Sequence, residues 1–503
     1  MTEKAPSGVI DSFRYAFSSP ARLRTEVFAG MTVALALIPE SIAFSILAGV
    51  DPAVGLFATV IMAITISFTG GRPAMITAAT GAIALVIAPV MRDHGFNYFI
   101  ATVILGGIFQ ILLAVLGIAR LMRFIPRSVM VGFVNALGIL VFSAQLPHLF
   151  NVPWLVYPLV AIGLVIVVGL PRLTTVVPAP LVAIVVLTAM VLAFGWSVPN
   201  VGDMGQLPSS LPGLLLPDVP LTLETFSIIA PYALGMAVVG IMESLMTAKL
   251  VDDITDTHSD KTRESWGQGV ANIVTGFFGG MGGCGMIGQT MINVRESGAR
   301  TRLSTLISGV FLLVLMLTLN NLVGQIPMAA LVAVMIVVSL GTIDWHSLHP
   351  RTLKFMPLSE TTAMLVTVVG TLGTGNLAVG VVLGVLTAMV TFTRRVAHLV
   401  RLEMVEELDT TGDGHPNIRT YKVHGQLFWA SSNDLVYQFD YNDEAEHIII
   451  DLSAAEIWDA STVATLDSIT HKFQQRGKTV EIIGLDGPSK WRLDHLSGQL
   501  GDS

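Results

Sequence analysis

Long apolar runs, separated by short polar or glycine-containing stretches, fill the chain up to about residue 393. A run of about 20 apolar residues can cross a bilayer as a helix, and a shorter run can form a half-helix. The pattern predicts fourteen such segments. They lie near 27–48, 52–69, 74–91, 97–119, 124–146, 152–171, 176–195, 228–249, 267–283, 284–294, 303–324, 327–343, 360–374 and 376–393.

Lys and Arg are distributed unevenly between the predicted loops, and this asymmetry predicts the orientation. Cytoplasmic loops of membrane proteins carry an excess of Lys and Arg. With the N-terminus inside, the outside loops hold only Arg92, and the long loop 196–226 holds neither residue type. The inside loops hold Arg72, Arg120, Arg123, Arg127, Arg172, Lys249, Lys261, Arg263, Arg295, Arg300, Arg302, Arg351, Lys354, Arg394 and Arg395. We therefore expect a multi-pass protein of a plasma (inner) membrane, with both termini in the cytoplasm.

Composition supports the membrane assignment and excludes several function classes. Only 13% of the 503 residues are charged, whereas a soluble domain has about 25%. The single cysteine, Cys284, excludes an intrachain disulfide. No Walker A pattern, HExxH motif or nucleophile elbow occurs in the sequence, so neither an ATP-driven pump nor an enzyme is indicated. We expect no cofactor, no metal site and no nucleic-acid partner.

The composition changes after Arg395, where charged and polar residues replace the apolar runs. HIIIDLS (447–453) and KTVEIIGL (478–485) are typical of buried strands, and residues 461–476 between them have helical periodicity. Alternating strands and helices predict a small α/β domain. At the start of its helix, Ser461 is interpreted as an N-cap.

Five stretches resemble the SulP family, the sulfate-permease-like anion transporters with a C-terminal STAS domain. The stretches follow the family's order over nearly the whole chain. They are ALIPESIAFSILAGVDPAVGLFATV (36–60), MESLMTAKLVDDIT (242–255), CGMIGQTMINVRESGARTRLS (284–304), VHGQLFWASS (423–432) and IIIDLSAAEIWDASTV (448–463).

The resemblance implies an α-helical membrane protein whose fourteen spans form a seven-plus-seven inverted repeat, as in uracil transporters. Spans 1–4 and 8–11 would form a core domain, and spans 5–7 and 12–14 a gate domain. The implied division is a cytoplasmic segment 1–26, a transporter domain 27–398 and a cytoplasmic STAS domain 399–503. Family members move sulfate, bicarbonate, dicarboxylates or halides, usually as homodimers. The resemblance also places Ser461 in the loop whose serine is phosphorylated in anti-sigma factor antagonists, which is the alternative to its interpretation as a helix N-cap.

Glycine crowds the third segment of each predicted half. The first half has GGRPAMITAATGAIALVI (70–87), and the second has GGMGGCGMIGQTMIN (279–293). A helix that starts inside the bilayer leaves its first N–H groups unpaired and directs a partial positive charge inward. Two such helix ends that face each other would bind an anion. Tight helix packing is the alternative explanation of the glycines.

The paired segments, taken with the family resemblance, favour the anion site. The predicted substrate-binding residues are Thr77, Ala79, Thr80, Gly81, Gly285, Met286, Ile287 and Gly288, with Phe44 as a further lining residue for which plain packing is the alternative. No Lys or Arg lies within the predicted spans except Arg127 and Lys249, each at a cytoplasmic end. Many SulP proteins have Arg where Gln289 stands here, so a backbone-based site for a small carboxylate or bicarbonate is favoured over tight sulfate binding.

Two carboxylates, Glu40 in the first span and Glu243 in the eighth, are predicted to lie within the membrane, and Thr247 is one turn from Glu243. An ionised carboxylate there is costly, so a functional role is the default hypothesis. A structural, hydrogen-bonded carboxylate is the alternative. The family often has Gln where Glu40 stands, and its sodium-dependent members tend to have Asp near the Glu243 position. We therefore assign coupling to a proton rather than sodium, on Glu243 first, with Glu40 as the alternative and Thr247 beside the site.

The predicted function is secondary active transport of a small anion, with proton-coupled symport of a dicarboxylate first, bicarbonate second and sulfate third. The anion would lie between the N-termini of the half-helices in spans 3 and 10. Two alternatives stay open. One is an uncoupled anion exchanger or channel of the same fold, and the other is a membrane-anchored STAS signalling protein.

Overall fold

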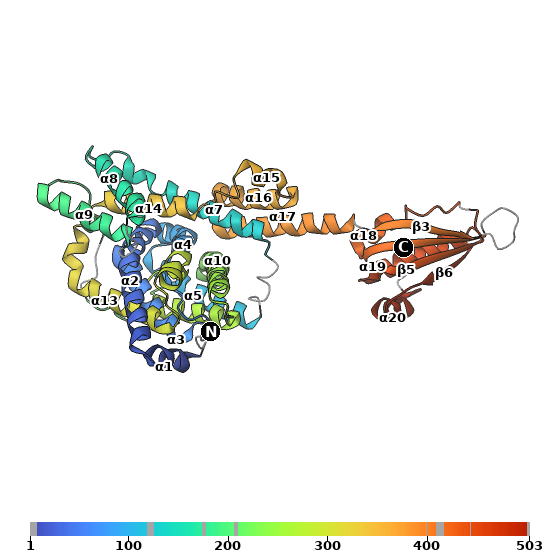
Figure 1. The fold of residues 1–503 in the computed structure, drawn as a ribbon, viewed down its shortest axis with the longest axis horizontal. Helices are drawn as coiled ribbons and strands as arrows, with labels where there is room; N and C mark the ends of the chain where they lie inside the picture. The colour runs from blue at the N-terminus through green and yellow to red at the C-terminus, as the bar shows by residue number, and fades with distance from the viewer. Residues whose placement is uncertain are drawn as a thin grey trace. The chain divides into compact units, whose positions relative to one another are not determined.

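The computed structural model describes residues 8–117, 125–173, 178–205, 210–398, 400–408, 417–442 and 444–499. The ends of predicted segments that fall at 118–119, 124 and 176–177 lie outside these residues, as do Arg120 and Arg123. The chain forms two compact units, Met1–Val385 and Leu386–Ser503 (Figure 1).

The first unit is helical apart from two three-residue strands, β1 (Thr77–Ala79) and β2 (Gly283–Gly285). Its first helices are α1 (Val9–Phe17), α2 (Pro20–Ala48), α3 (Pro52–Thr69), α4 (Gly81–His94), α5 (Phe96–Val115), α7 (Arg127–Ser143), α8 (Val156–Gly169) and α9 (Ala179–Phe194). The helices that follow are α10 (Leu223–Thr255), α11 (Lys261–Phe277), α12 (Ile287–Met291), α13 (Arg302–Gly324), α14 (Met328–Thr342), α15 (Pro350–Phe355), α16 (Leu358–Thr374) and α17 (Leu377–Ala397), the last of which continues into the second unit. Short 3₁₀ turns are η2 (Leu146–Leu149), η3 (Leu170–Arg172) and η4 (Val201–Met204), and η5 (Ile292–Glu296) is a π-helix that prolongs α12.

A helix occupies each of the fourteen predicted segments. Among the described residues, seven helices are long and apolar enough to cross a membrane alone. The count of fourteen crossings therefore stays a prediction. The predicted starts at 74 and 284 are wrong as helix starts, because a strand precedes each helix and α4 and α12 begin only at Gly81 and Ile287.

The helices of the first unit pack in two groups. Contacts are most extensive within the group α2, α3, α5, α10, α11 and α13, and within the group α7, α8, α9, α14 and α16 (Figure 1). Helix α4 packs against α2, α5 and α10 of the first group. Fewer contacts join the groups, and these involve α2 with α14 and α9, and α4 with α7. The groups correspond to the core and gate that the family resemblance implies.

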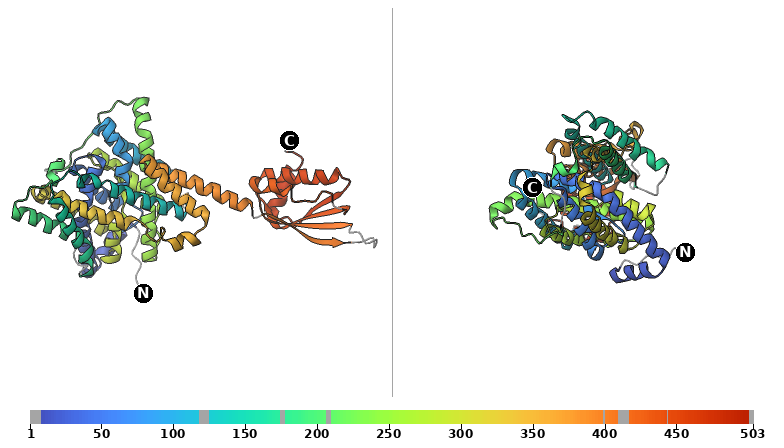
Figure 2. Two further views of the ribbon diagram at one scale, coloured as in Figure 1. Left: turned by 90° about the horizontal axis from the view of Figure 1, so that it is seen from above. Right: turned by 90° about the vertical axis from the view of Figure 1, so that its left-hand side faces the viewer.

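The second unit contains a four-stranded sheet of order β3-β4-β5-β6, with helices beside it (Figure 2). Its elements are β3 (Arg401–Leu408), β4 (Ile418–Leu427), α18 (Trp429–Leu435), β5 (His447–Ile457), α19 (Ala460–Gln474), β6 (Thr479–Ile483) and α20 (Gly487–Leu496). β3 and β4 are antiparallel, whereas β4, β5 and β6 are parallel. Apolar side chains of α19 and the strands form one buried cluster, which confirms the predicted α/β unit.

The interpretation of Ser461 as a helix cap is wrong. Asp459 is the N-cap of α19, and its carboxylate accepts the backbone N–H of Thr462 at 3.0 Å. Ser461 lies inside the first turn with an exposed side chain. Aspartate and serine are both strong N-cap residues, so the sequence DAST fits either position.

Candidate functional site

Strands β1 and β2 pair antiparallel in the middle of the first helix group. Thr77 lies opposite Gly285, and Ala79 lies opposite Gly283. Each strand is followed after one residue by a helix, so α4 and α12 leave the pair in opposite directions. The two helix N-termini therefore start close together, as the half-helix hypothesis predicted.

The glycines of the stretch 279–293 have two different roles. A Cβ atom placed on Gly283 would collide with the carbonyl oxygen of Ala78, so glycine is required where the two strands approach each other. A Cβ atom on Gly288 would meet nothing within 4 Å. Gly283 serves packing, whereas Gly288 borders open space.

Side chains of neighbouring helices satisfy the backbone of the strand pair. The Asn272 amide donates to the Gly283 carbonyl at 3.1 Å and accepts the Gly283 N–H at 2.9 Å. Asn293 donates to the Ala74 carbonyl at 2.8 Å. Ser244 accepts the N–H of Gly285 at 2.9 Å. Irregular backbone can be buried at membrane depth only when its polar groups are paired in this way.

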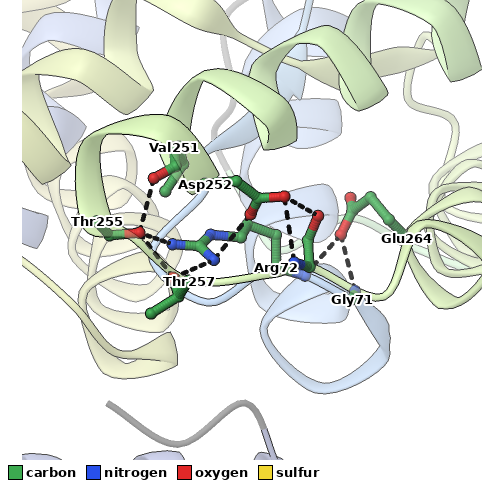
Figure 3. Close-up of polar contacts among 8 residues, drawn as sticks. Gly71, Arg72, Val251, Asp252, Thr255, Thr257 and Glu264 are labelled. Atoms are coloured by element: carbon green, nitrogen blue, oxygen red, sulfur yellow. Dashed lines mark hydrogen bonds and ion pairs between the residues drawn. The ribbon is translucent and has the colours of Figure 1, made fainter. Parts of the chain in front are cut away.

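The loop before β1 is held by a buried polar cluster (Figure 3). The Glu264 carboxylate accepts the N–H groups of Gly71 and Arg72 at 2.7 and 3.0 Å. The Arg72 guanidinium pairs with Asp252 at 2.9 Å and donates to Thr257 at 2.7 Å. These contacts tie β1 to α10 and α11, and they account for an arginine that the sequence placed in a cytoplasmic loop.

A cavity of about 140 Å³ lies where α4 and α12 begin. Thr80 and Gly81 from the start of α4, and Ile287 and Gly288 from the start of α12, line it. Its other walls come from α2, α7, α10 and α14. The cavity thus lies at the junction of the two helix groups, at the ends of two helices whose first N–H groups have no intrahelical partner.

The backbone donors at these helix ends are available to a ligand. Within the described chain, the N–H groups of Gly81, Ala82, Ile287 and Gly288 donate no hydrogen bond. Each helix end also contributes a partial positive charge, which stabilises a nearby anion by about 0.3–1 kcal/mol, or ~2 kcal/mol in a partly buried site. This arrangement can bind an anion without a cationic side chain.

Both intramembrane carboxyls line the cavity and contact the segment that carries β2 and α12. The Gln289 amide nitrogen donates to Glu40 Oε1 at 2.5 Å. The Cys284 thiol donates to Glu243 Oε2 at 2.8 Å and lies 3.2 Å from Thr80 Oγ1. Glu40 and Glu243 are buried, with 7% and 9% of their surfaces exposed. Their partners, Gln289 and Cys284, were not singled out as such, because hydrogen bonds between distant segments leave no signal in sequence spacing.

The structure brings most, but not all, of the predicted site residues together. Those that line the cavity are Glu40, Phe44, Thr80, Gly81, Glu243, Met286, Ile287 and Gly288. Thr77, Ala79, Gly285 and Thr247 do not line it. The N–H groups of Ala79 and Gly285 are paired with Thr59 and Ser244, and the Thr247 hydroxyl donates to backbone carbonyls.

The sequence pattern does not indicate the gate side of the cavity. Phe133, Leu137 and Val141 of α7, and Val338 and Thr342 of α14, line it. Apolar residues recur all around these helices, so no periodicity distinguishes a cavity face from a lipid face.

Among the described residues, no group of three or more His, Cys, Asp or Glu side chains could hold a metal ion.

Comparison with known proteins identifies the family. The sequence model of the sulfate permease family matches residues 23–157 and 151–369. The chain belongs to the sulfate permease family. The STAS domain model matches residues 410–496, which lie in the second unit. The sulfate permease family consists of membrane anion transporters, so the chain is a multi-pass membrane protein of that family.

Two curated relatives cover nearly the whole chain of this sulfate permease family member. "Putative sulfate transporter YbaR" of Bacillus subtilis is 52% identical over 94% of this chain and 97% of its own length. "Bicarbonate transporter BicA" of Picosynechococcus is 25% identical over 94% of this chain and 91% of its own length.

Solved structures share the fold. The transmembrane domain of a cyanobacterial bicarbonate transporter BicA superposes with a TM-score of 0.62 at 26% identity, over 74% of this chain and 97% of that domain. Murine Slc26a9, an anion transporter in its inward-facing state, gives a TM-score of 0.81 at 15% identity, over 97% of this chain and 89% of its own. The likeness to Slc26a9 confirms an SLC26-like transmembrane fold, predicted here as a core and a gate with a C-terminal STAS domain.

Proposed function

We propose that the protein is a proton-coupled symporter of a small carboxylate anion, which binds between the N-termini of α4 and α12. The observation that supports this proposal most directly is the cavity itself. Unpaired backbone N–H groups of both helix ends line it together with two carboxyls, Glu40 and Glu243. The small-anion substrates in the names of its relatives, sulfate and bicarbonate, agree with an anion as cargo.

The lining favours an organic anion. Among the described residues, no Lys, Arg or His lines the cavity, whereas Phe44, Phe133, Leu137 and Val141 contribute apolar surface. Sulfate binds tightly where cationic forks and many donors neutralise it. A dicarboxylate combines anionic ends with an apolar body, so we place it first, bicarbonate second and sulfate third.

Proton coupling follows from the electrostatics of the lining. Two ionised carboxylates beside a bound anion would repel it strongly in a site of low dielectric constant. A proton on one carboxyl removes part of that repulsion. Linkage then requires that the bound anion in turn strengthens proton binding. Sodium is the alternative coupling ion.

Proteoliposomes that contain the full chain test the proposal. Uptake of radiolabelled succinate, bicarbonate and sulfate would be measured with an inward proton gradient, with an inward sodium gradient and with neither. We expect proton-driven accumulation of succinate. Exchange without accumulation would establish the uncoupled exchanger, and no movement of any anion would favour the STAS signalling alternative.

Orientation and assembly complete the proposal. We propose a plasma (inner) membrane location with cytoplasmic termini, and a homodimer of two full chains. The orientation rests on the Lys and Arg asymmetry of the loops. The dimer rests on the family resemblance, and light scattering of the purified protein in detergent checks it.

A further inference from the structure

In the side-chain amide of Gln289, the nitrogen has a hydrogen-bond partner and the oxygen has none among the described residues. Gln289 follows Gly288 in α12 and is buried, with 4% of its surface exposed. Its Nε2 donates to Glu40 Oε1. Within the described chain, its Oε1 is buried and has no hydrogen-bond partner. A buried amide oxygen without a donor is unfavourable, so the arrangement calls for an additional donor next to it.

A protonated Glu40 is the group that can supply this donor. An ionised carboxylate only accepts hydrogen bonds, so an ionised Glu40 cannot donate to the amide oxygen of Gln289. A carboxylic acid and a primary amide instead form two hydrogen bonds side by side, N–H to C=O and O–H to O=C. The first bond is present in the structure, and a proton on Glu40 Oε2 would supply the donor of the second.

We propose that Glu40 and Gln289 form the proton-binding pair of the transporter. The Glu40 carboxylate takes one proton from water that reaches the cavity, forms an O–H bond at Oε2 and releases the same proton on the other side of the membrane. In the protonated state the acid and the amide are joined by both hydrogen bonds. The proposal rests on the proposed symport and assigns its coupling site to Glu40 rather than to Glu243.

The surroundings of Glu243 are different and do not call for a proton. The Cys284 thiol donates to its carboxylate, so the partner of Glu243 is a donor. Among the described residues, no buried acceptor without a partner belongs to Thr80 or Cys284, the side chains at this contact. Glu243 is therefore paired in its ionised form, whereas the Glu40 pair is complete only in the neutral form.

Few other charges surround Glu40. Glu243 is the other titratable group that lines the cavity, and Cys284 is bonded to it. Helices α3, α12 and α14, which pack against α2, contain no titratable side chain. Strand β1 and helix α9, which also pack against α2, contain no titratable side chain either. The titratable residues of the adjoining elements α4, α13 and η5 lie at the ends of those elements and are Arg92, Asp93, His94, Arg295, Glu296 and Arg302. Helix α1 contributes Asp11, Arg14 and Tyr15, and the other titratable residues of α2 itself, Arg22, Arg24 and Glu26, lie near its N-terminus.

The pair links the proton to the anion through α12. Gly288, which borders the cavity with a free N–H, is the residue before Gln289. In the protonated state, two hydrogen bonds between Gln289 and Glu40 hold this turn of α12 against α2. Loss of the proton leaves only the hydrogen bond from the Gln289 amide nitrogen. Protonation therefore fixes the backbone donors of α12 at the moment when the repulsion between Glu40 and the anion is removed.

Infrared difference spectroscopy tests the pair without relying on transport. The full chain in lipid nanodiscs would be titrated with acid, and the C=O stretch of a protonated carboxyl would be followed. We expect a band that Glu40→Gln removes and Glu243→Gln retains. Gln289→Met, which keeps the side-chain volume but removes both hydrogen bonds, should move this band to higher frequency. A band that survives Glu40→Gln, or that Gln289→Met leaves in place, would overturn the proposal.

A swap of the two side chains tests the coupling. In proteoliposomes, Glu40→Gln should abolish the pH dependence of succinate uptake, because two amides form the same paired arrangement without a titratable proton. The double variant Glu40→Gln with Gln289→Glu restores an acid–amide pair, and the pH dependence should return. A folded double variant whose uptake stays independent of pH would contradict the pair.

The infrared and transport experiments distinguish a failure of the proposed function from a failure of the proposed proton-binding pair. If none of the three anions is transported, the proposed function is wrong, and the infrared band still decides the pair. If proton-driven uptake is found in the folded Glu40→Gln variant, the symport stands and the assignment to Glu40 is wrong.

Discussion

At the scale of single residues, Gly283 and Gly288 lie in different environments, and their substitution tests the two roles proposed for the glycines. Gly288→Leu should keep the unfolding temperature, because its side chain enters open space, and should abolish succinate binding by filling the cavity. Gly283→Ala should lower stability by about 1–3 kcal/mol or more, because its Cβ would meet the Ala78 backbone. Thermal unfolding measures the stability of each variant, and a binding titration measures its affinity for succinate. Normal uptake by a folded Gly288→Leu protein would remove that position from the site.

Arg72 offers a second test at this scale. Its guanidinium is buried against Asp252, so Arg72→Ala leaves a largely buried carboxylate without its cation. Breaking such a pair costs about 3–5 kcal/mol. Arg92→Ala is the matched control, because that side chain is 75% exposed and pairs with its sequence neighbour Asp93. We expect a lower unfolding temperature for the first variant alone. Equal effects of the two would show that the cluster does not hold the loop before β1.

Residue types predicted the site only in part. Glu40, Glu243 and the glycine-rich segments stand out because carboxylates and irregular backbone are costly in a bilayer. The gate residues Leu137, Val141 and Val338 do not stand out. In a membrane helix both the lipid face and the protein face are apolar, so the sequence does not reveal which side points to a cavity.

At the scale of elements, the strand pair joins the two half-helices, and Asn272 is the side chain that completes it. It exchanges two hydrogen bonds with Gly283 and donates a third to Gln110 at 2.9 Å. Asn272→Leu should therefore destabilise the protein, by about 1–3 kcal/mol for each buried group left unpaired. Asn97→Leu, at an exposed position of α5, is the control. If thermal unfolding is unchanged in Asn272→Leu, the strand pair does not depend on this residue.

The same elements show why helices were easier to predict than their starts. Runs of apolar residues fix the presence of a helix, and fourteen predicted segments each contain one. The start depends on where the backbone stops pairing with another strand. Nothing within residues 70–87 reveals that 77–79 will pair with 283–285, because that partner lies about two hundred residues away.

At the scale of the whole molecule, every residue that lines the cavity belongs to the unit Met1–Val385. A chain that ends at residue 398 should therefore fold and bind succinate with unchanged affinity, although transport can fall through lost dimer support. Fluorescence-detected size exclusion reports folding, and a binding titration reports the site. Loss of binding in a well-folded truncated protein would mean that the second unit contributes to the site.

Orientation in the bilayer decides which side must be acidified to drive uptake. The loop 196–226 has no Lys or Arg, so we expect it outside, and the second unit should lie inside. Cysteines introduced by Ser210→Cys and Ser453→Cys, both at exposed positions, report the two sides to a membrane-impermeant thiol reagent. The native Cys284 is buried and gives a low background. In intact cells the first should react at once and the second only after permeabilisation. Reaction of both from one side would rule out the seven crossings predicted between these two positions, and with them the inverted repeat of seven plus seven spans.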